Sequence, residues 1–208
     1  MPLNKNILKR KKDDEFIHQK RNHEALNLYV TSDFHLFHAN IIRYSNRPFK
    51  DVDEMNETII QNYNLTIKDD DMVIHLGDLS AGLKKRQNEL KALLQRLKGK
   101  KILLRGNHDY EPDSFYLEAG FEKVEHFLVI KNYFFNHYAL EANSFTNEQE
   151  KINTLEFLKS NCNIIVHGHT HARDVNSPII GYNTSNKTLQ RINTCVDANH
   201  FYPLKLEL

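Results

Sequence analysis

Short apolar runs alternate with longer amphipathic segments along the chain from Asn27 onward. A short apolar run bounded by polar positions is typical of a strand buried on both faces, and the segments between these runs have helical spacing. The alternation therefore predicts an α/β arrangement of strands and crossover helices. We predict buried strands at residues 28–32, 72–76, 101–104 and 163–166.

Two of the intervening segments carry apolar residues at helical spacing. The first covers residues 52–63 and has Asp51 available as its N-cap, with Glu54 at the capping-box spacing. In the second, leucines recur within residues 90–97, and Gly99 stands where a left-handed C-cap is expected. Both patterns predict amphipathic helices.

The C-terminal half contains one more predicted helix and three weaker strands. The helix covers residues 147–160. Three apolar residues at helical spacing mark it: Ile152, Leu155 and Leu158. The stretches 124–130 and 133–135 are predicted to form a hairpin around Lys131-Asn132. Residues 203–208 alternate with period two, as expected for a half-exposed strand.

Length and composition indicate a globular protein. The chain has 208 residues, of which 40% are apolar and 26% are charged. These values are ordinary for a folded protein, and we predict a single domain over residues 26–208. Residues 1–25 are mostly charged and are predicted to form a solvated N-terminal arm.

Charge and the lack of long apolar segments restrict the partners and the location. Lys and Arg total 28 and Asp and Glu total 27, so the net charge of +1 does not indicate binding to polymeric nucleic acid. The N-terminus lacks the apolar core of a signal peptide, and no run has membrane-spanning length. We therefore expect a cytoplasmic protein without a membrane partner. Oligomeric state is not indicated.

Cys162 and Cys195 form no CxxC pair, so neither a disulfide framework nor a thiolate zinc site is expected.

Each predicted buried strand ends in a polar cluster. The clusters are, in chain order, Asp33-Phe-His35, Gly77-Asp78, Gly106-Asn-His-Asp109 and Gly168-His-Thr-His171. Ligands bind at the carboxyl ends of strands in open α/β sheets, so these clusters are expected to meet at one edge. Their carboxylate, amide and imidazole groups suit manganese, iron, zinc or nickel, and they are too rich in nitrogen for a dedicated calcium site. The donors are too numerous for one ion, which favours two.

The order of these clusters resembles the calcineurin-like metallophosphoesterase superfamily. The motifs DxH, GD, GNHD, a lone His and GHxH correspond to Asp33 to His35, Gly77-Asp78, Gly106 to Asp109, His137 and Gly168 to His171. The resemblance alone identifies His137. It implies a four-layer α/β/β/α sandwich of two mixed β-sheets flanked by helices.

The resemblance also implies a ligand set for two divalent ions, of which manganese is the one that we favour. Asp33, His35 and His171 are expected to hold one ion. Asn107, His137 and His169 are expected to hold the other, and Asp78 is expected to bridge the two. His108 then binds no metal.

The implied reaction is hydrolysis of a small phosphate ester by a metal-bound hydroxide. His108 is expected to donate a proton to the departing alkoxide or to stabilise it, and Asp109 is expected to orient its imidazole. We favour a phosphodiester substrate. The alternatives are a phosphomonoesterase, a nuclease acting on polymeric DNA or RNA, and a noncatalytic scaffold. The presence of every expected ligand disfavours the scaffold.

Overall fold

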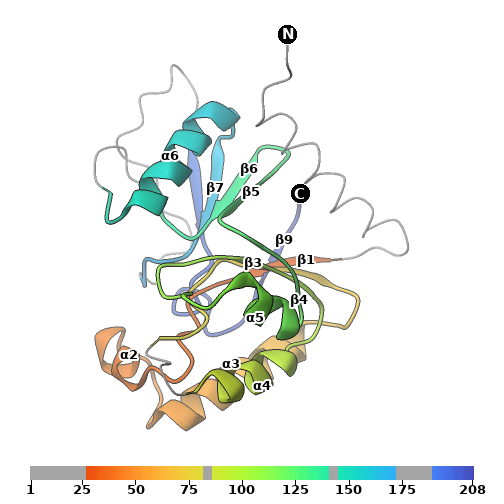
Figure 1. The fold of residues 1–208 in the computed structure, drawn as a ribbon, viewed down its shortest axis with the longest axis vertical. Coiled ribbons are helices and arrows are strands. Elements are labelled where there is room, and N and C mark those ends of the chain that lie inside the picture. The colour runs from red at the N-terminus through yellow and green to blue at the C-terminus, as the bar shows by residue number, and fades with distance from the viewer. Residues whose placement is uncertain (1–26, 82–85, 141–144, 172–188) are drawn as a thin grey trace.

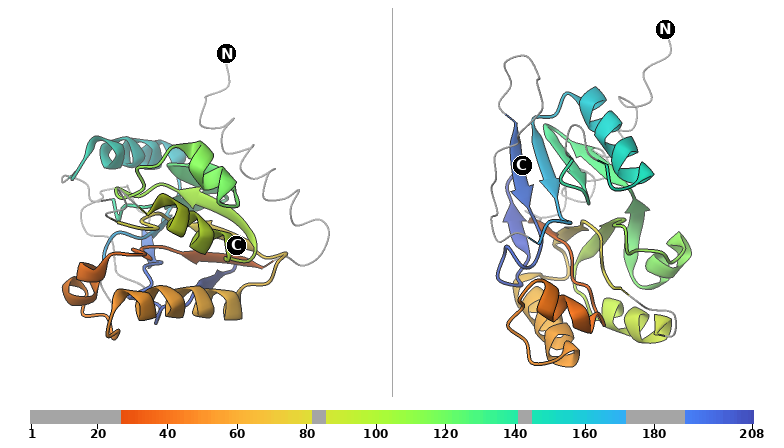
Figure 2. Two further views of the ribbon diagram at one scale, coloured as in Figure 1. Left: turned by 60° about the horizontal axis from the view of Figure 1, so that its bottom comes forward. Right: turned by 90° about the vertical axis from the view of Figure 1, so that its left-hand side faces the viewer.

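The structure of the protein is a computed structural model that describes residues 27–81, 86–140, 145–171 and 189–208. Two mixed β-sheets pack face to face, and helices cover the outer face of each sheet (Figures 1 and 2). The predicted four-layer α/β/β/α sandwich is therefore confirmed. The N-terminal arm predicted at residues 1–25 lies outside the described residues.

The larger sheet has five strands in the order β4-β3-β2-β1-β9. They are β1 (Leu28–Thr31), β2 (Met72–His75), β3 (Lys100–Leu104), β4 (Phe121–Glu125) and β9 (Leu204–Leu206). The first four are parallel, and β9 pairs antiparallel with β1. The carboxyl ends of β1, β2 and β3 therefore lie at the same edge of the sheet.

The smaller sheet has four strands in the order β5-β6-β7-β8. They are β5 (Phe127–Ile130), β6 (Tyr133–Asn136), β7 (Ile164–His167) and β8 (Gln190–Asn193). Strands β5 and β6 form the predicted hairpin, and β6, β7 and β8 are parallel. The five helices of the described residues are α2 (Ala39–Tyr44), α3 (Val52–Thr66), α4 (Gln87–Gln95), α5 (Asp113–Glu118) and α6 (Glu148–Ser160).

Three hydrophobic clusters separate the four layers. Apolar residues of the two sheets, among them Val30, Ile74 and Val166, pack against each other in the middle. Helices α3, α4 and α5 cover the other face of the larger sheet, and α6 covers that of the smaller sheet through Phe157. Strands β2 and β3 are buried on both faces, which explains their continuous apolar runs.

The predicted helix at residues 52–63 is present as α3. Its N-cap Asp51 accepts a hydrogen bond of 2.9 Å from the backbone N–H of Glu54. The predicted C-cap of α4 is wrong, because the helix ends at Gln95 and its C-cap is Arg96. Gly99, with φ of 81°, instead forms the turn into β3, where a Cβ would lie 2.9 Å from the carbonyl oxygen of Asp71.

Helix α6 buries a different face from the one that its apolar residues indicate. Its buried residues are Glu150, Asn153, Thr154 and Phe157. Ile152, Leu155 and Leu158, which mark the helix in the sequence, are 42–50% exposed. The polar residues are buried because they form specific hydrogen bonds, such as that from Asn153 Nδ2 to the carbonyl of His126.

The strand predicted at residues 124–130 is two strands. Its first part belongs to β4 of the larger sheet, and its second part is β5 of the smaller sheet. The chain crosses between the sheets at His126, and apolar residues on both sides hide this boundary in the sequence. Among the described residues, no helix is long and apolar enough to span a membrane.

Candidate metal centre

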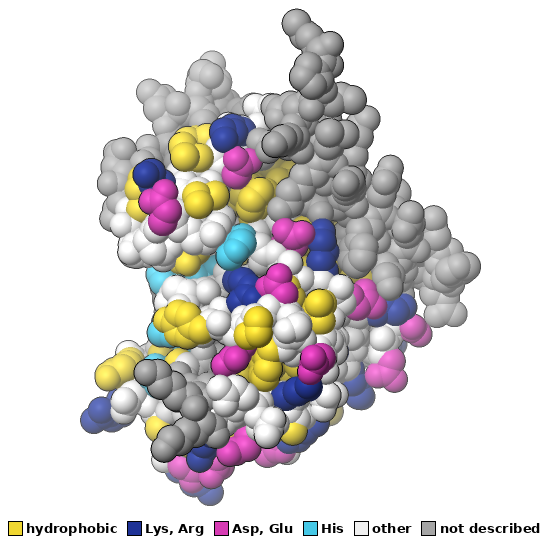
Figure 3. Space-filling view, in the orientation of Figure 1, with side chains coloured by type: hydrophobic (Ala, Val, Ile, Leu, Met, Phe, Trp, Pro, Cys, Tyr) yellow, Lys and Arg dark blue, Asp and Glu magenta, His cyan; other side chains and the backbone are white. Residues whose placement is uncertain are grey.

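The loops that follow β1, β2, β3, β6 and β7 bring the predicted ligands to one place. Asp33 and His35 follow β1, Asp78 follows β2, and Asn107 follows β3. His137 follows β6 at once, and His169 and His171 follow β7. Histidine side chains reach the surface along the left side of the molecule, at a level between α6 and α3 (Figure 3). The predicted convergence of the polar clusters is therefore observed.

Asp78 occupies the middle of the centre. Its Oδ2 atom lies 3.5 Å from His35 Nε2 and 3.5 Å from His137 Nε2. Its other oxygen, Oδ1, accepts a hydrogen bond of 2.9 Å from the backbone N–H of His108. One carboxylate oxygen thus faces both imidazoles, as a bridging ligand requires.

His137, His169 and Asn107 form the first half of the centre. His137 Nδ1 lies 2.7 Å from the carbonyl oxygen of Leu76 and donates to it in the neutral ring. Its Nε2 atom is then unprotonated and faces Asn107 Oδ1 and His169 Nδ1, each at 3.1 Å. Lone pairs that converge in this way attract a cation.

Asp33, His35 and His171 lie in the second half. The His171 Nε2 atom is 4.0 Å from Asp33 Oδ1, and the rings of His35 and His171 have centroids 5.1 Å apart. Both oxygens of Asp33 accept from the backbone N–H of His169, at 3.1 and 3.0 Å, and the Ser32 hydroxyl also donates to this carboxylate. The two halves are therefore hydrogen bonded to each other.

Three groups of donor atoms in the described residues are close enough to hold an ion. They are Asp78 with His137 and His169, His35 with Asp78 and His108, and Asp33 with His171 and Cys195. All the His and Asp residues assigned to metal appear in these groups, and Asp78 is shared by two of them. The expected set of Asp33, His35 and His171, however, is divided between two groups. Two members, His108 and Cys195, were not predicted as ligands. Both cysteines are buried, and neither forms a disulfide.

Four predicted ligands have left-handed backbone conformations. The φ angles are 60° for Asp33, 51° for His35, 56° for Asp78 and 66° for His169. Such a conformation costs about 1–3 kcal/mol for a residue with a side chain, and it persists only where the surroundings impose it. Gly168 shows how tight these surroundings are, because a Cβ there would overlap Asp33 Oδ2 and Ser32 Oγ.

The chemistry of the centre fits divalent cations. His35 is 2% exposed, and neither of its ring nitrogens has a hydrogen-bond partner among the described residues. Burial lowers the pKa of His35 to about 2, so its ring is neutral and has a lone pair that can bind a cation. Burial raises the pKa of Asp78 to about 7, and nearby Asp33 and Asp109 add to the rise. A cation beside Asp78 would oppose that rise.

Asp109 is engaged by the backbone. Its Oδ2 atom accepts from the N–H groups of Asp78 and Gly106, both at 2.8 Å, and Oδ1 accepts from that of Leu79 at 3.0 Å. The expected contact with the His108 imidazole is not among the hydrogen bonds of the described residues. Asp109 therefore ties the turn after β2 to the turn after β3.

His108 is half-buried beside this turn. Its ring centroid lies 5.3 Å from that of His35, and burial lowers its pKa.

His167 precedes the ligands His169 and His171 in the sequence. It is the last residue of β7 and is buried. Its Nδ1 atom contacts the carbonyl oxygen of Gly168 at 2.8 Å, and burial lowers its pKa to about 4. His167 thus has a structural position next to the ligands.

Two residues that were not predicted from the sequence contact the centre, Arg47 and Asp197. Asp197 Oδ2 lies 2.8 Å from His171 Nδ1 and 2.8 Å from Arg47 Nη2. Burial opposes ionisation, but the hydrogen bonds from His171 and Arg47 hold the pKa of Asp197 well below its usual range. Neither residue belongs to a motif, and β8, which precedes Asp197, was not predicted, so the sequence offered no signal for the pair.

Comparisons with known proteins indicate the family of the chain. The family model for calcineurin-like phosphoesterases matches residues 26–142, more than half of the chain. The uncharacterized protein MJ1445 of Methanocaldococcus jannaschii is 34% identical over 182 residues, which cover 87% of this chain and 88% of that protein. The gene 66 protein of Mycobacterium phage L5 is 34% identical over 83 residues, or 40% of each chain.

One solved structure supports the fold. The protein of unknown function AQ665 from Aquifex aeolicus has 24% sequence identity and a TM-score of 0.65, and the match covers 86% of this chain and 95% of that one. The family match spans the first four of the five motifs, and the structure brings all five together at one edge. The chain belongs to the calcineurin-like phosphoesterase family, whose members are metal-dependent phosphoester hydrolases.

Proposed function

We propose that the protein is a phosphodiesterase that works with two divalent ions. The observation that carries the proposal is the position of Asp78 Oδ2, 3.5 Å from both His35 Nε2 and His137 Nε2. A carboxylate oxygen placed between two imidazoles that come from different sheets suits a ligand shared by two ions.

The remaining ligands divide between the two positions. Asp33, His35 and His171 would hold one ion, and Asn107, His137 and His169 would hold the other. Manganese is the ion that we favour for this mixture of oxygen and nitrogen donors. When bound, the two ions would supply water that ionises near neutral pH and would stabilise charge on the phosphoryl oxygens.

Formal charges explain how a near-neutral protein attracts an anionic substrate. Two divalent ions contribute +4, and the carboxylates of Asp33 and Asp78 contribute −2. The excess positive charge is concentrated in one pocket, where it draws phosphate without a basic surface. This agrees with a net charge of only +1 for the whole chain.

His108 is proposed to act on the leaving group. Its backbone N–H is fixed by Asp78 Oδ1, which places the ring at the edge of the centre. The neutral ring still offers one N–H group. We propose that this group donates to the departing oxygen, so that negative charge is stabilised as the ester bond breaks.

Two series of aromatic rings favour a diester over a monoester. The first series starts at His35 and continues through His38 to Tyr44, and the successive ring centroids are 5.6 and 6.2 Å apart. The second series also starts at His35 and continues through His108 to Tyr110, and the successive ring centroids are 5.3 and 6.2 Å apart. Tyr44 is 69% exposed and Tyr110 is 79% exposed. A diester carries two substituents, and aromatic ones could stack on these two rings.

Side-by-side assays with bis(p-nitrophenyl) phosphate and p-nitrophenyl phosphate test the proposal. With added manganese or nickel, we expect faster turnover of the diester and loss of both activities with a chelator. Tyr44→Ala and Tyr110→Ala should raise KM for the diester, whereas Tyr202→Ala, an exposed tyrosine without a ring contact to these histidines in the described residues, should not.

Other outcomes would support the alternatives. Faster turnover of the monoester would identify a phosphomonoesterase. Activity only on long DNA or RNA, lost at high salt, would identify a nuclease. Absence of turnover with two bound ions on all of these substrates would favour a noncatalytic scaffold.

A further inference from the structure

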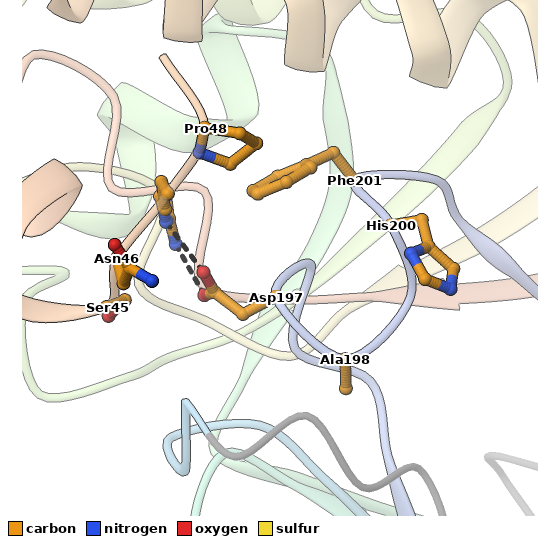
Figure 4. Close-up of a pocket in the computed structure, with 8 residues that line it drawn as sticks. Ser45, Asn46, Pro48, Asp197, Ala198, His200 and Phe201 are labelled. Carbon is orange, nitrogen blue, oxygen red and sulfur yellow. Dashed lines mark hydrogen bonds and ion pairs between the residues drawn. The ribbon is translucent and has the colours of Figure 1, made fainter.

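Asp197 and Arg47 form a buried ion pair directly behind His171. Arg47 is 4% exposed, and two of its side-chain nitrogens donate hydrogen bonds to the carboxylate of Asp197. The distances are 2.9 Å from Nε to Oδ1 and 2.8 Å from Nη2 to Oδ2. The dashed lines at Asp197 in Figure 4 mark this pair. We propose that Asp197, held by Arg47, is a positioning residue that fixes the ring of His171 for metal binding.

The contact between Asp197 and His171 selects the nitrogen that faces the centre. Asp197 Oδ2 lies 2.8 Å from His171 Nδ1. A carboxylate paired with a guanidinium accepts hydrogen bonds and donates none, so Nδ1 carries the hydrogen. The other nitrogen, Nε2, is the one directed toward Asp33 Oδ1 at 4.0 Å. A carboxylate bound to the second nitrogen of a ligand histidine fixes both its tautomer and the direction of its ring.

Arg47 also fixes the backbone on the opposite side of the same ion position. Its Nη2 donates to the carbonyl oxygen of Asp33 at 2.8 Å, and its Nη1 donates to that of Phe34 at 2.9 Å. Asp33 has a φ angle of 60°, a conformation that its surroundings must impose. One guanidinium therefore holds two proposed ligands of the same ion, Asp33 through its backbone and His171 through Asp197.

A pocket next to Asp197 makes this role accessible to a chemical test. It has a volume of about 410 Å³ and is lined by Asp197, Arg47 and Phe201, among others. Figure 4 shows Asp197 between Asn46 and Phe201 at this pocket. Removal of the Asp197 side chain would extend the pocket toward His171, and a small carboxylate such as acetate could enter and take its place.

The inference rests on the proposed function, because it concerns one of two proposed ions. The test is manganese binding to the full chain, measured by calorimetry and by electron paramagnetic resonance of free manganese. Asp197→Asn, Asp197→Ala and Arg47→Lys are compared with wild type. Lysine keeps the charge of Arg47 but cannot form the bidentate pair of hydrogen bonds to the carboxylate of Asp197. Asp71→Asn is the matched control, because Asp71 is also buried and hydrogen bonded but precedes β2, at the opposite end of the sheet.

We expect wild type and Asp71→Asn to bind two ions alike. The three variants at Asp197 and Arg47 should bind one ion about 10- to 100-fold more weakly, the usual effect of removing such a partner, and the other with little change. Acetate should restore the weaker site in Asp197→Ala and have no effect on wild type. Unfolding in the presence of a chelator checks that each variant is folded.

Two results would overturn the inference. Unchanged binding of both ions in Asp197→Asn and Asp197→Ala would show that Asp197 does not position His171. Equal loss of both sites without rescue by acetate would show that Asp197 serves only the fold. A wild-type protein that binds no manganese, nickel, zinc or iron would instead refute the proposed metal centre itself.

Discussion

Replacement of Asp109 by alanine tests whether this residue supports the fold or orients His108. The carboxylate accepts from three backbone N–H groups, those of Asp78, Gly106 and Leu79, at 2.8–3.0 Å. Asp78 and Leu79 are almost completely buried, and Gly106 is half-buried. Alanine would leave two fully buried donors and one partly buried donor without an acceptor.

The expected loss follows from these three contacts. A buried donor without a partner costs about 1–3 kcal/mol, so the two buried amides alone account for roughly 2–6 kcal/mol. Burial raises the pKa of Asp109, and removing this unfavourable charge offsets part of the loss. We expect the free energy of unfolding to fall by about 3 kcal/mol for Asp109→Ala. Asp109→Asn, which keeps one acceptor oxygen, should lie between alanine and wild type.

Urea denaturation in the presence of a chelator measures this effect without a contribution from metal. With a slope of about 2 kcal/mol per molar urea, the unfolding midpoint should shift by about 1.5 M. The control is Asp113→Ala, because the Asp113 side chain is 63% exposed in its ion pair with Arg105, and ion pairs at the surface contribute less than about 1 kcal/mol. A midpoint for Asp109→Ala equal to that of the control, together with slower turnover, would refute the structural role and favour orientation of His108.

Three further substitutions separate the roles of other residues. His108→Ala should keep both ions in metal analysis but slow turnover by roughly 10²- to 10⁴-fold, and unchanged kcat would remove His108 from the reaction. Asp78→Ala should release metal, since it deletes the shared ligand; two ions per chain in that variant would contradict the assignment. Gly168→Ala places a Cβ against Asp33 and Ser32, so its melting temperature without metal should fall by roughly 4–8 °C, as overpacking by about 2 kcal/mol implies. An unchanged melting temperature would mean that these side chains move aside freely.

The ligands were predictable because their motifs lie at the ends of recognisable strands. Apolar runs locate β1, β2, β3 and β7, and parallel pairing places the carboxyl ends of the first three at one edge. His137 is different, because a lone histidine carries no local pattern and only the family resemblance identified it. Asp109 was recognised as part of a motif, but its contact with three amides depends on how two turns meet.

The sequence by itself determined the fold class and the ordered set of donor residues, because apolar periodicity and short motifs are local properties of the chain. Tertiary structure alone decided the buried face of α6, where Asn153 is inside and Ile152, Leu155 and Leu158 are 42–50% exposed. It also decided that Arg47 and Asp197 meet behind His171, although 150 positions separate them in the sequence. Such contacts depend on the packing of segments that carry no shared pattern, and their hydrogen bonds exist only after the two sheets have come together.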